Sequence, residues 1–534
     1  MAQDSKQSFM RGAAILSVST IIVKVFGLLF TFLIANMVPQ GDRTYFYGAY
    51  DVFGIFMAVA ATGLPVAVSR MVSNAHALGN KREAEKIFSV SAALFFVIGT
   101  IGALAMFVFA PQISEFMNAG NDMGKYAIMA LAPTVFLYSL MAPIRGYFQG
   151  RSNMLPTAVS QTIEAVVKLI VGVALVVLIM NTLGRGELAV SGAIFGVTVS
   201  TAVAALYLYY CKRKQKKADK FEEIKEPSKF VSGKKEILIS LTKIALPIAL
   251  GAAFLNCLYV VDSAIVAIRL EEAARFTNEE MRIMKGFLGQ ATKLFDLPAT
   301  LVVPFATTLL PVLTGAIARK DENSVTGIST ISIRVALLIS VPCALGMGLF
   351  AEPISRIIYP GDAANVANIL MPMAVAIIFS SIVLTTSSIL QAFGKVYLPV
   401  FTMLIAAVVR IVLDWVLTGN REINILGAPI ALVVSYLINM VLNLIVIKKI
   451  VPNSTSFIKM FMPPLAASLA MGAVSYPIYH FLSMVMDTRI AVAIAILFAV
   501  LVYVIFAVLL KAIKKDEILM MPKGEKIVKV LRLK

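Results

Sequence analysis

The chain has 534 residues, of which 59% are hydrophobic and only 15% are charged. This balance lies far outside the composition of soluble globular domains and predicts an integral membrane protein. The formal net charge of +18 would suit a nucleic-acid binder, but the basic residues gather beside long apolar segments, so we predict no nucleic-acid partner.

Apolar segments long enough to cross a bilayer, about 20 residues each, follow one another along the chain. We identify fourteen of them, near residues 10–37, 46–74, 87–110, 125–148, 156–181, 188–211, 237–268, 287–318, 324–350, 365–392, 396–418, 425–447, 457–482 and 489–513. Backbone polar groups inside a bilayer must find partners within the protein, and no alternating barrel pattern is present, so these segments are expected to be helices. The predicted fold class is an all-α integral membrane protein with 14 transmembrane helices.

The sequence also contains an internal repeat. The motif FAPQIS at 109–114 returns as FAEPIS at 350–355, and AVVK at 165–168 returns as AVVR at 407–410. A polar stretch at 212–236 separates the two copies. Six is an even number of helices, so we predict two parallel six-helix repeats plus two extra C-terminal helices. Transporters built this way hold their working site between the repeats, near mid-depth, and rock one half against the other.

The repeat sets the expected domains. They are an N-lobe over 1–211, a basic cytoplasmic linker over 212–236, a C-lobe over 237–450, a pair of further helices over 451–513 and a basic cytoplasmic tail over 514–534. Most of the 48 Lys and Arg lie at the N-terminus, in the loops between even- and odd-numbered segments and in the tail. The positive-inside rule therefore places both termini in the cytoplasm. Binding of the basic runs to anionic lipid headgroups is an alternative that stays open.

Several ionisable residues lie inside the apolar segments, where each costs roughly 2.5–3.5 kcal/mol on insertion scales and so needs a reason. Lys24 lies in the first segment, Asp51 in the second and Asp262 in the seventh. Lys293 and Asp296 lie in the eighth. These segments occupy corresponding places in the two copies, so we predict a polar cleft at their shared boundary, where the two lysines bind substrate. In the alternative, the lysines snorkel or pair with Asp51 and Asp296 to hold the halves together.

Two further pairs have the spacing of one helical turn. Arg410 and Asp414 are four residues apart, as are Glu164 and Lys168, so each pair can meet on one helix face and serve as a structural ion pair. A cation site near Asp414 is the alternative. Arg70 lies close enough to the inner surface to snorkel, or to guard the cytoplasmic mouth of the path.

The chain has none of the common motifs for cofactor or nucleotide chemistry. It contains no Walker A motif, no Gly-rich nucleotide loop and no zinc-ligand spacing, and its three cysteines lie inside apolar runs. We therefore expect no cofactor, no metal, no catalytic residue and no obligatory ATPase subunit. The identity of a coupling ion stays open.

The motif RGYFQG at 145–150, followed by PTAVSQ at 156–161, resembles the polysaccharide-biosynthesis branch of the multidrug/oligosaccharidyl-lipid/polysaccharide (MOP) flippase superfamily. The motif KLFDLP at 293–298, with LLP at 309–311, resembles the eighth-helix signature of lipid II flippases. The resemblance spans essentially the whole chain. It points to the MurJ-like group of Gram-positive bacteria, which includes the relatives of stage V sporulation protein B.

The resemblance implies a cationic cavity lined by the first, second, seventh and eighth helices. It also implies that the two helices over 451–513 form a groove for the lipid tail. By position, Lys24 and Lys293 fall where the family has cavity arginines, and Phe30 occupies the place of a second arginine on the first helix. Lysine lacks the bidentate fork of arginine, but its charge still suits a pyrophosphate.

These observations predict a non-enzymatic flippase that moves an undecaprenyl-pyrophosphate-linked peptidoglycan precursor, lipid II, from the inner to the outer leaflet by alternating access. Its expected setting is cell wall biogenesis and cell shape in a bacterial plasma membrane, with the lipid-linked sugar pyrophosphate and membrane lipids as partners. One alternative is a flippase for another lipid-linked oligosaccharide or polysaccharide unit. Another is a MATE-like cation-coupled drug exporter. A membrane enzyme that polymerises lipid-linked sugars would need a larger outer loop than the one at 269–285.

Overall fold

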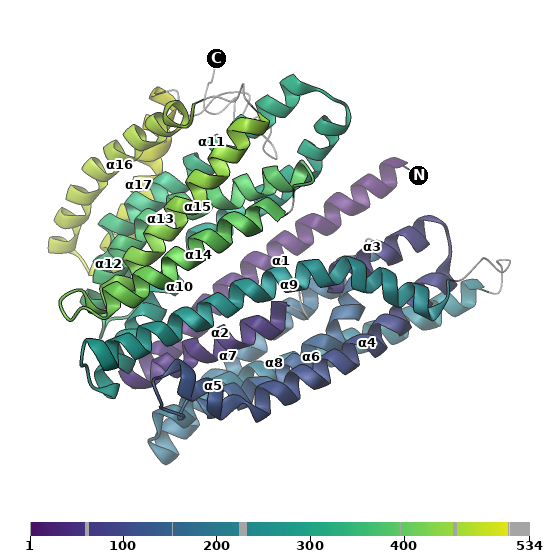
Figure 1. The fold of residues 1–534 in the computed structure, drawn as a ribbon, viewed down its shortest axis with the longest axis horizontal. Coiled ribbons are helices and arrows are strands. Elements are labelled where there is room, and N and C mark those ends of the chain that lie inside the picture. Colours follow the sequence, from purple (N-terminus) through teal and green to yellow (C-terminus); the bar gives the residue numbers. More distant parts are fainter. Residues whose placement is uncertain are drawn as a thin grey trace. The chain divides into compact units, whose positions relative to one another are not determined.

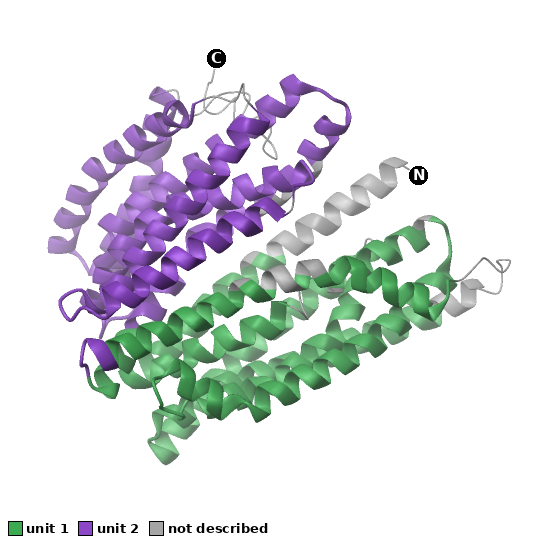
Figure 2. Ribbon diagram, in the orientation of Figure 1, with its two compact units in different colours: residues 1–271, 277–286 green, residues 272–276, 287–534 purple. Residues whose placement is uncertain are grey.

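The structure is a computed structural model, and it describes residues 2–58, 64–151, 153–223, 232–395, 397–451, 456–510 and 512. Every regular element in these ranges is a helix (Figure 1). Contacts divide the chain into two compact units (Figure 2). The first unit comprises residues 1–271 and 277–286, and the second comprises 272–276 and 287–534.

Helices of the first unit follow the apolar segments closely. They are α1 (Ala2–Met37), α2 (Arg43–Met57), α3 (Leu64–Ala77), α4 (Lys81–Val108), α5 (Ala110–Met117), α6 (Lys125–Gly150), α7 (Leu155–Leu183), α8 (Gly186–Glu223) and α9 (Lys234–Ile268), with a 3-10 turn at Gln40–Asp42 and a π-helical turn at Arg269–Ala273. The first turns of α10 (Asn278–Ala318) also belong to this unit.

The second unit contains the rest of α10 and the helices that follow it. They are α11 (Glu322–Leu349), α12 (Ala351–Ile358), α13 (Ala363–Ala392), α14 (Tyr397–Thr418), α15 (Gly427–Ile450), α16 (Phe457–Val485) and α17 (Thr488–Leu509), with a 3-10 turn at Asn424–Leu426.

Ten helices in the described part of the chain are long and apolar enough to cross a membrane: α4, α6, α7, α8, α11, α13, α14, α15, α16 and α17. Expected segments 10–37, 237–268 and 287–318 fall on α1, α9 and α10. Expected segment 46–74 falls on two helices, α2 and α3, and residues 59–63 between them lie outside the described ranges. The all-helical class is confirmed, and the total of 14 spans stays a prediction.

The first unit is built around α6, α7 and α8, which pack against one another, with α4 on α6 and α1 on α7. Close approach of α7 and α8 requires glycine. A Cβ added to Gly196 would lie only 2.6 Å from the Cα of Gly172. Small residues of this kind let membrane helices pack backbone against backbone, where dispersion contacts replace the missing hydrophobic drive.

The second unit is built around α11, α13 and α15. Helices α16 and α17 pack against each other, and α16 also packs against α11. The Tyr503 hydroxyl of α17 donates to the Leu338 carbonyl of α11 over 2.8 Å, so α17 is also bound to α11.

Local structure is similar at corresponding places of the two units. Asn80 caps α4 by accepting from the Glu83 backbone N–H at 3.1 Å, and Asp321 caps α11 by accepting from Ser324 at 3.0 Å. Both helices are 28 residues long and are followed by a helix of 8 residues, which carries the FAPQIS motif in one unit and FAEPIS in the other. The full six-helix repeat stays a prediction.

The predicted domain boundaries do not coincide with the two units. Helix α9, expected to open the C-lobe, belongs to the first unit, where it packs against α2, α3 and α4. Helix α8 extends into the predicted linker as far as Glu223, while residues 224–231 and the predicted tail over 514–534 lie outside the described ranges. The two units are defined by contacts, whereas the predicted lobes were defined by the sequence repeat, so the lobes stay a prediction.

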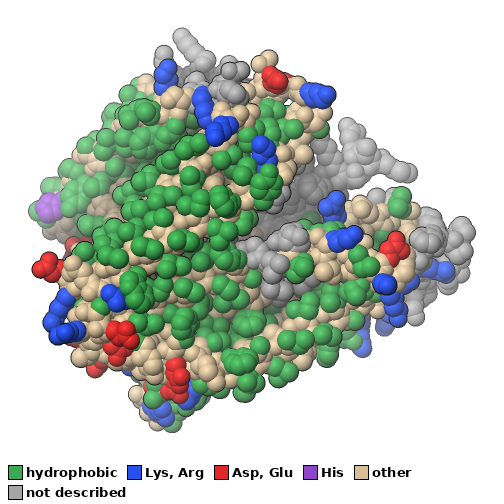
Figure 3. Space-filling model, viewed as in Figure 1, with side chains coloured by type: hydrophobic (Ala, Val, Ile, Leu, Met, Phe, Trp, Pro, Cys, Tyr) green, Lys and Arg blue, Asp and Glu red, His purple; other side chains and the backbone are tan. Residues whose placement is uncertain are grey.

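Hydrophobic side chains cover the visible helix faces, and charged side chains gather toward the helix ends (Figure 3). Exposed residues such as Leu104, Ile170 and Leu497 are 59%, 63% and 73% exposed. An apolar surface of this extent is unfavourable in water but suits contact with lipid acyl chains.

Candidate functional site

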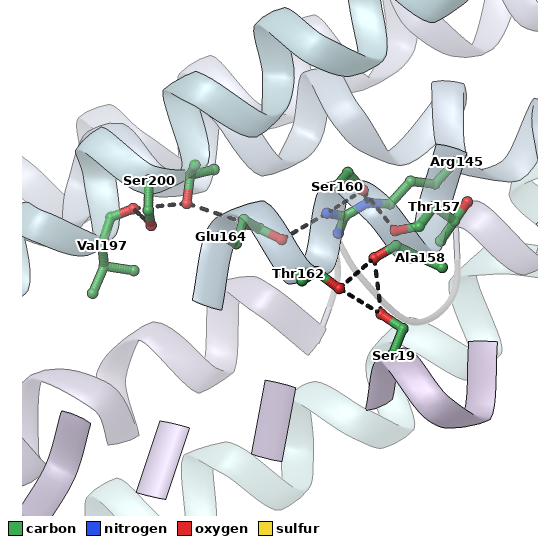
Figure 4. A network of polar contacts seen from close by, with 10 residues as sticks. Ser19, Arg145, Thr157, Ala158, Ser160, Thr162, Glu164, Val197 and Ser200 are labelled. Atoms are coloured by element: carbon green, nitrogen blue, oxygen red, sulfur yellow. Dashed lines mark hydrogen bonds and ion pairs between the residues drawn. The ribbon is translucent and has the colours of Figure 1, made fainter. Parts of the chain in front are cut away.

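Helices α1 and α7 run side by side in the first unit, in the same direction. Near one end, the Ser19 hydroxyl donates to the Ala158 carbonyl over 2.8 Å and lies 3.2 Å from the Thr162 hydroxyl (Figure 4). Farther along both helices, the Phe30 ring lies against Gly172, where an added Cβ would be 2.5 Å from the ring. These contacts fix α1 lengthwise against α7.

A buried ion pair lies behind this contact. The Arg145 guanidinium of α6 donates to the Glu164 carboxylate of α7 over 2.6 Å (Figure 4). The same guanidinium donates to the Ser160 hydroxyl at 3.1 Å, and its carbon lies 5.5 Å from the centre of the Tyr138 ring. Several partners therefore satisfy the buried charge, as a charge in a low-dielectric interior requires.

This pair was not predicted from the sequence. The sequence pairs Glu164 with Lys168 on the same helix, but the ion pair that the structure shows for Glu164 is with Arg145 on α6. The sequence used Arg145 only as part of a family motif. Arg145 lies inside the apolar segment 125–148, where a charge needs a partner. This position was the available signal that Arg145 could pair with Glu164.

Lys168 and Lys24 lie on facing helices of the first unit. Lys24 of α1 is exposed, and Lys168 of α7 is half-buried. The charge of Lys168 is attracted by the Glu164 carboxylate and, to a smaller extent, repelled by Lys24. The Lys168 Nζ atom lies 5.1 Å from the centre of the Phe30 ring, within the range of a cation–π contact.

A second polar group in this unit joins α2, α9 and the start of α10. The Lys285 ammonium donates to the Met117 carbonyl at the end of α5, and its charge is attracted to Asp51 and Asp262. Asp262 is buried and Asp51 is half-buried. The sequence placed Lys285 at the end of the outer loop and did not associate it with these carboxylates.

Other predicted residues are dispersed. Lys293 is half-buried and Asp296 exposed on the part of α10 that belongs to the second unit. Arg70 is exposed on α3. The predicted meeting of Lys24 with Lys293 in one cleft stays a prediction.

Arg410 and Asp414 face each other on α14 of the second unit, with 3.6 Å between the Arg410 Nε and an Asp414 carboxylate oxygen. Asp414 is fully buried. Within the described residues, no group of three or more His, Cys, Asp or Glu side chains could hold a metal ion. The alternative of a cation bound near Asp414 stays a prediction.

Comparison with family models gives two overlapping matches. Residues 9–317 match the model described as polysaccharide biosynthesis protein. Residues 287–500 match the model described as lipid II flippase MurJ.

Curated relatives match along most of the chain. Stage V sporulation protein B of Bacillus subtilis (strain 168) is 26% identical over 520 residues, which cover 97% of this chain and 98% of that protein. Lipid II flippase MurJ of the same organism is 24% identical over 453 residues, which cover 82% of each.

Solved structures show the same fold. A lipid II flippase MurJ in an inward closed conformation aligns with a TM-score of 0.69 at 18% identity, covering 92% of this chain and 97% of that one. An inward-facing multidrug resistance transporter of the MATE family, in the MOP superfamily, aligns with a TM-score of 0.66 at 15% identity, covering 87% and 99%. The chain is therefore a multi-span helical membrane protein with a MurJ-like fold.

Proposed function

Since this chain belongs to the polysaccharide biosynthesis protein family, we propose that it is a flippase for a lipid-linked sugar. Within that family it is a MurJ-like and stage V sporulation protein B-like member of the MOP superfamily. The cargo we propose is lipid II, an undecaprenyl-pyrophosphate-linked peptidoglycan precursor. The lipid would move from the inner to the outer leaflet by alternating access, during cell wall biogenesis.

The observation that carries this proposal is the exposed ammonium of Lys24, in the interior of an apolar helix. A lysine at the centre of a membrane helix costs roughly 2.5–3.5 kcal/mol, so such residues face a polar path rather than acyl chains. A cationic path suits the pyrophosphate of a lipid-linked sugar. We assign Lys293 to the same path, with Asp51, Asp262, Asp296 and Arg70 along it.

The membrane potential supplies a driving force for this movement. With the inside negative, each negative charge that moves outward gains about 2.3 kcal/mol per 100 mV. Two net charges on a pyrophosphate headgroup would gain roughly 4–5 kcal/mol at that voltage. Apolar α16 and α17, which pack as a pair, are the surface we propose for the prenyl tail. No covalent chemistry is needed, and we propose that both termini lie in the cytoplasm.

A drug exporter of the same superfamily is the rival function, since the fold alone is shared with a MATE transporter. Charge argues against it. Lys24 and Lys168 are both cations on facing helices of the first unit, and they would repel the cationic drugs that such an exporter would carry.

Purified protein in liposomes tests the proposal, with fluorescent lipid II and a reagent that modifies only the outer leaflet. We expect wild type to move lipid II and Lys24→Ala to lose about tenfold or more of the rate, while Lys214→Ala, at an exposed position of α8, keeps it. If the protein moved another undecaprenyl-pyrophosphate-linked sugar but not lipid II, the assignment of the cargo would change. Uptake of a cationic dye without any lipid movement would overturn the flippase proposal.

A further inference from the structure

We propose that the basic end of α8 is a binding surface for the headgroup of an anionic phospholipid. The surface is formed by Arg213 and Lys217, beside the rings of Tyr209 and Tyr210. It belongs to the first unit alone, and it would bind its lipid whichever cargo the protein transports.

One face of α8 carries large exposed side chains. Leu206, Tyr209 and Tyr210 are 70%, 51% and 64% exposed. Arg213 and Lys217, which are also exposed, follow Leu206 by seven and eleven residues. Because an α-helix has 3.6 residues per turn, these five positions lie on one face. Along its length, this face therefore changes from apolar through aromatic to basic.

The opposite face of α8 packs against the protein. Leu208 is fully buried and Lys212 is only 5% exposed. The Lys212 ammonium forms an ion pair with Glu85 of α4, and it lies 3.4 Å from the centre of the Tyr147 ring of α6. Two adjacent cations thus differ in role, since Lys212 is bound inside the unit while Arg213 faces outward.

The length of α8 places the exposed cations at headgroup depth. The helix begins at Gly186, and about 20 residues cross a hydrocarbon core of about 30 Å. A crossing that starts there ends just before Tyr209 and Tyr210, which have the side chain most typical of a membrane–water interface besides tryptophan. Arg213 lies one turn farther along the helix, about 5 Å, and Lys217 another turn beyond it.

Both cations are available to a ligand. Among the residues that the structure describes, neither Arg213 nor Lys217 forms an ion pair. The guanidinium carbon of Arg213 lies 4.6 Å from the centre of the Tyr209 ring, a cation–π contact that holds the group without cancelling its charge. A guanidinium can donate two hydrogen bonds to one phosphate, and the lysine adds a second positive charge.

An anionic phospholipid matches both parts of this face. Its phosphate suits Arg213 and Lys217, and its acyl chains suit Leu206, whereas a soluble polyanion would contact only the charges. Basic residues beside a membrane span are attracted to anionic leaflets. A topology signal alone requires only positive charge. The ring beneath the Arg213 guanidinium is the feature that binding explains in addition.

Titration of the full-length protein in detergent with phosphatidylglycerol or phosphatidylcholine, followed by native mass spectrometry, tests the surface. We expect wild type to prefer phosphatidylglycerol, and Arg213→Gln/Lys217→Gln to bind it about tenfold more weakly. Arg319→Gln/Lys320→Gln, which removes two exposed cations from the turn after α10, is the control and should bind like wild type. No preference in wild type, or equal affinities in the two double variants, would overturn the surface.

Two further measurements test the details. Tyr209→Leu keeps an apolar side chain but removes the ring beneath Arg213, so it should weaken phosphatidylglycerol binding by about threefold, whereas Tyr397→Leu, at an exposed tyrosine of α14, should not. Wild-type affinity in Tyr209→Leu would overturn the positioning of Arg213 by the ring. Displacement of phosphatidylglycerol by an equimolar amount of lipid II would overturn the phospholipid assignment and leave the proposed transport function standing.

Discussion

Arg145 donates to Glu164 across the α6–α7 interface at 2.6 Å, with both side chains buried. The contact matters beyond its own strength, because Glu164 stands one turn before Lys168. The Glu164 carboxylate therefore lies between two cations, with Arg145 at hydrogen-bonding distance and Lys168 attracted to it electrostatically.

Removing one member of the Arg145–Glu164 ion pair should destabilise the protein. We expect Arg145→Met to lower the free energy of unfolding by about 3–5 kcal/mol, because it leaves a buried carboxylate without its cation. Arg145→Met/Glu164→Gln should recover much of that loss. The measurement is thermal or denaturant unfolding in detergent. Arg185→Met, which breaks an exposed pair with Glu187, is the control and should cost about 0–1 kcal/mol. Equal losses in the two arginine variants would contradict the argument.

Gly172 should not tolerate a methyl group. An added Cβ would lie 2.5 Å from the Phe30 ring and 2.9 Å from the Ala193 carbonyl oxygen, which is backbone and cannot easily move. We expect Gly172→Ala to destabilise the protein by about 1–3 kcal/mol. Gly27→Ala on α1 is the matched control, since nothing lies within 4 Å of its added Cβ. Thermal melts of both variants measure this difference. A melting temperature of Gly172→Ala equal to or above that of Gly27→Ala would refute the close packing of α1, α7 and α8.

A polar cluster holds α13, α14 and α15 together in the second unit. The Thr402 hydroxyl donates to the buried Asn443 side chain at 2.7 Å, and the Asn443 amide donates to Thr386 at 3.1 Å. We expect Thr402→Val to cost about 1–3 kcal/mol, because it leaves the Asn443 oxygen without this donor. Thr100→Val, whose hydroxyl bonds only within its own helix, should stay within about 0.5 kcal/mol of wild type in the same unfolding assay.

The N-cap of α11 gives a test outside the membrane-spanning part. Asp321→Ala should lower the melting temperature. Asp321→Asn should lower it less, because asparagine caps a helix as well as aspartate does. Hydrogen bonds from the Ser324 side chain and backbone lower the pKa of Asp321. The contribution of the charged cap is therefore complete above the ordinary pKa of about 3.9 and is lost as the pH falls through the lowered value. Melting curves at several pH values check this pH dependence. An Asp321→Ala variant that melts like wild type at neutral pH would refute the cap.

The apolar segments could be read from the sequence because partition into a bilayer depends on the summed hydrophobicity of about 20 consecutive residues. The same local logic explains why Lys24 and Arg410 were noticed, as charges inside apolar runs. Segment 46–74 was predicted as one helix, whereas the structure describes α2 and α3 within it, with residues 59–63 outside the described ranges.

The sequence by itself determined that this chain is a helical membrane protein with cations at costly positions, because burial in lipid is a property of each segment alone. Only the tertiary structure decided which partners those charges have. Spacing allowed Glu164 to meet Lys168, but α6 brings Arg145 to the same carboxylate, and a buried carboxylate binds the cation that packing presents to it at hydrogen-bonding distance. Spacing likewise allowed Arg410 to meet Asp414, but it could not show that Lys168 faces the ring of Phe30, because that ring comes from a different helix.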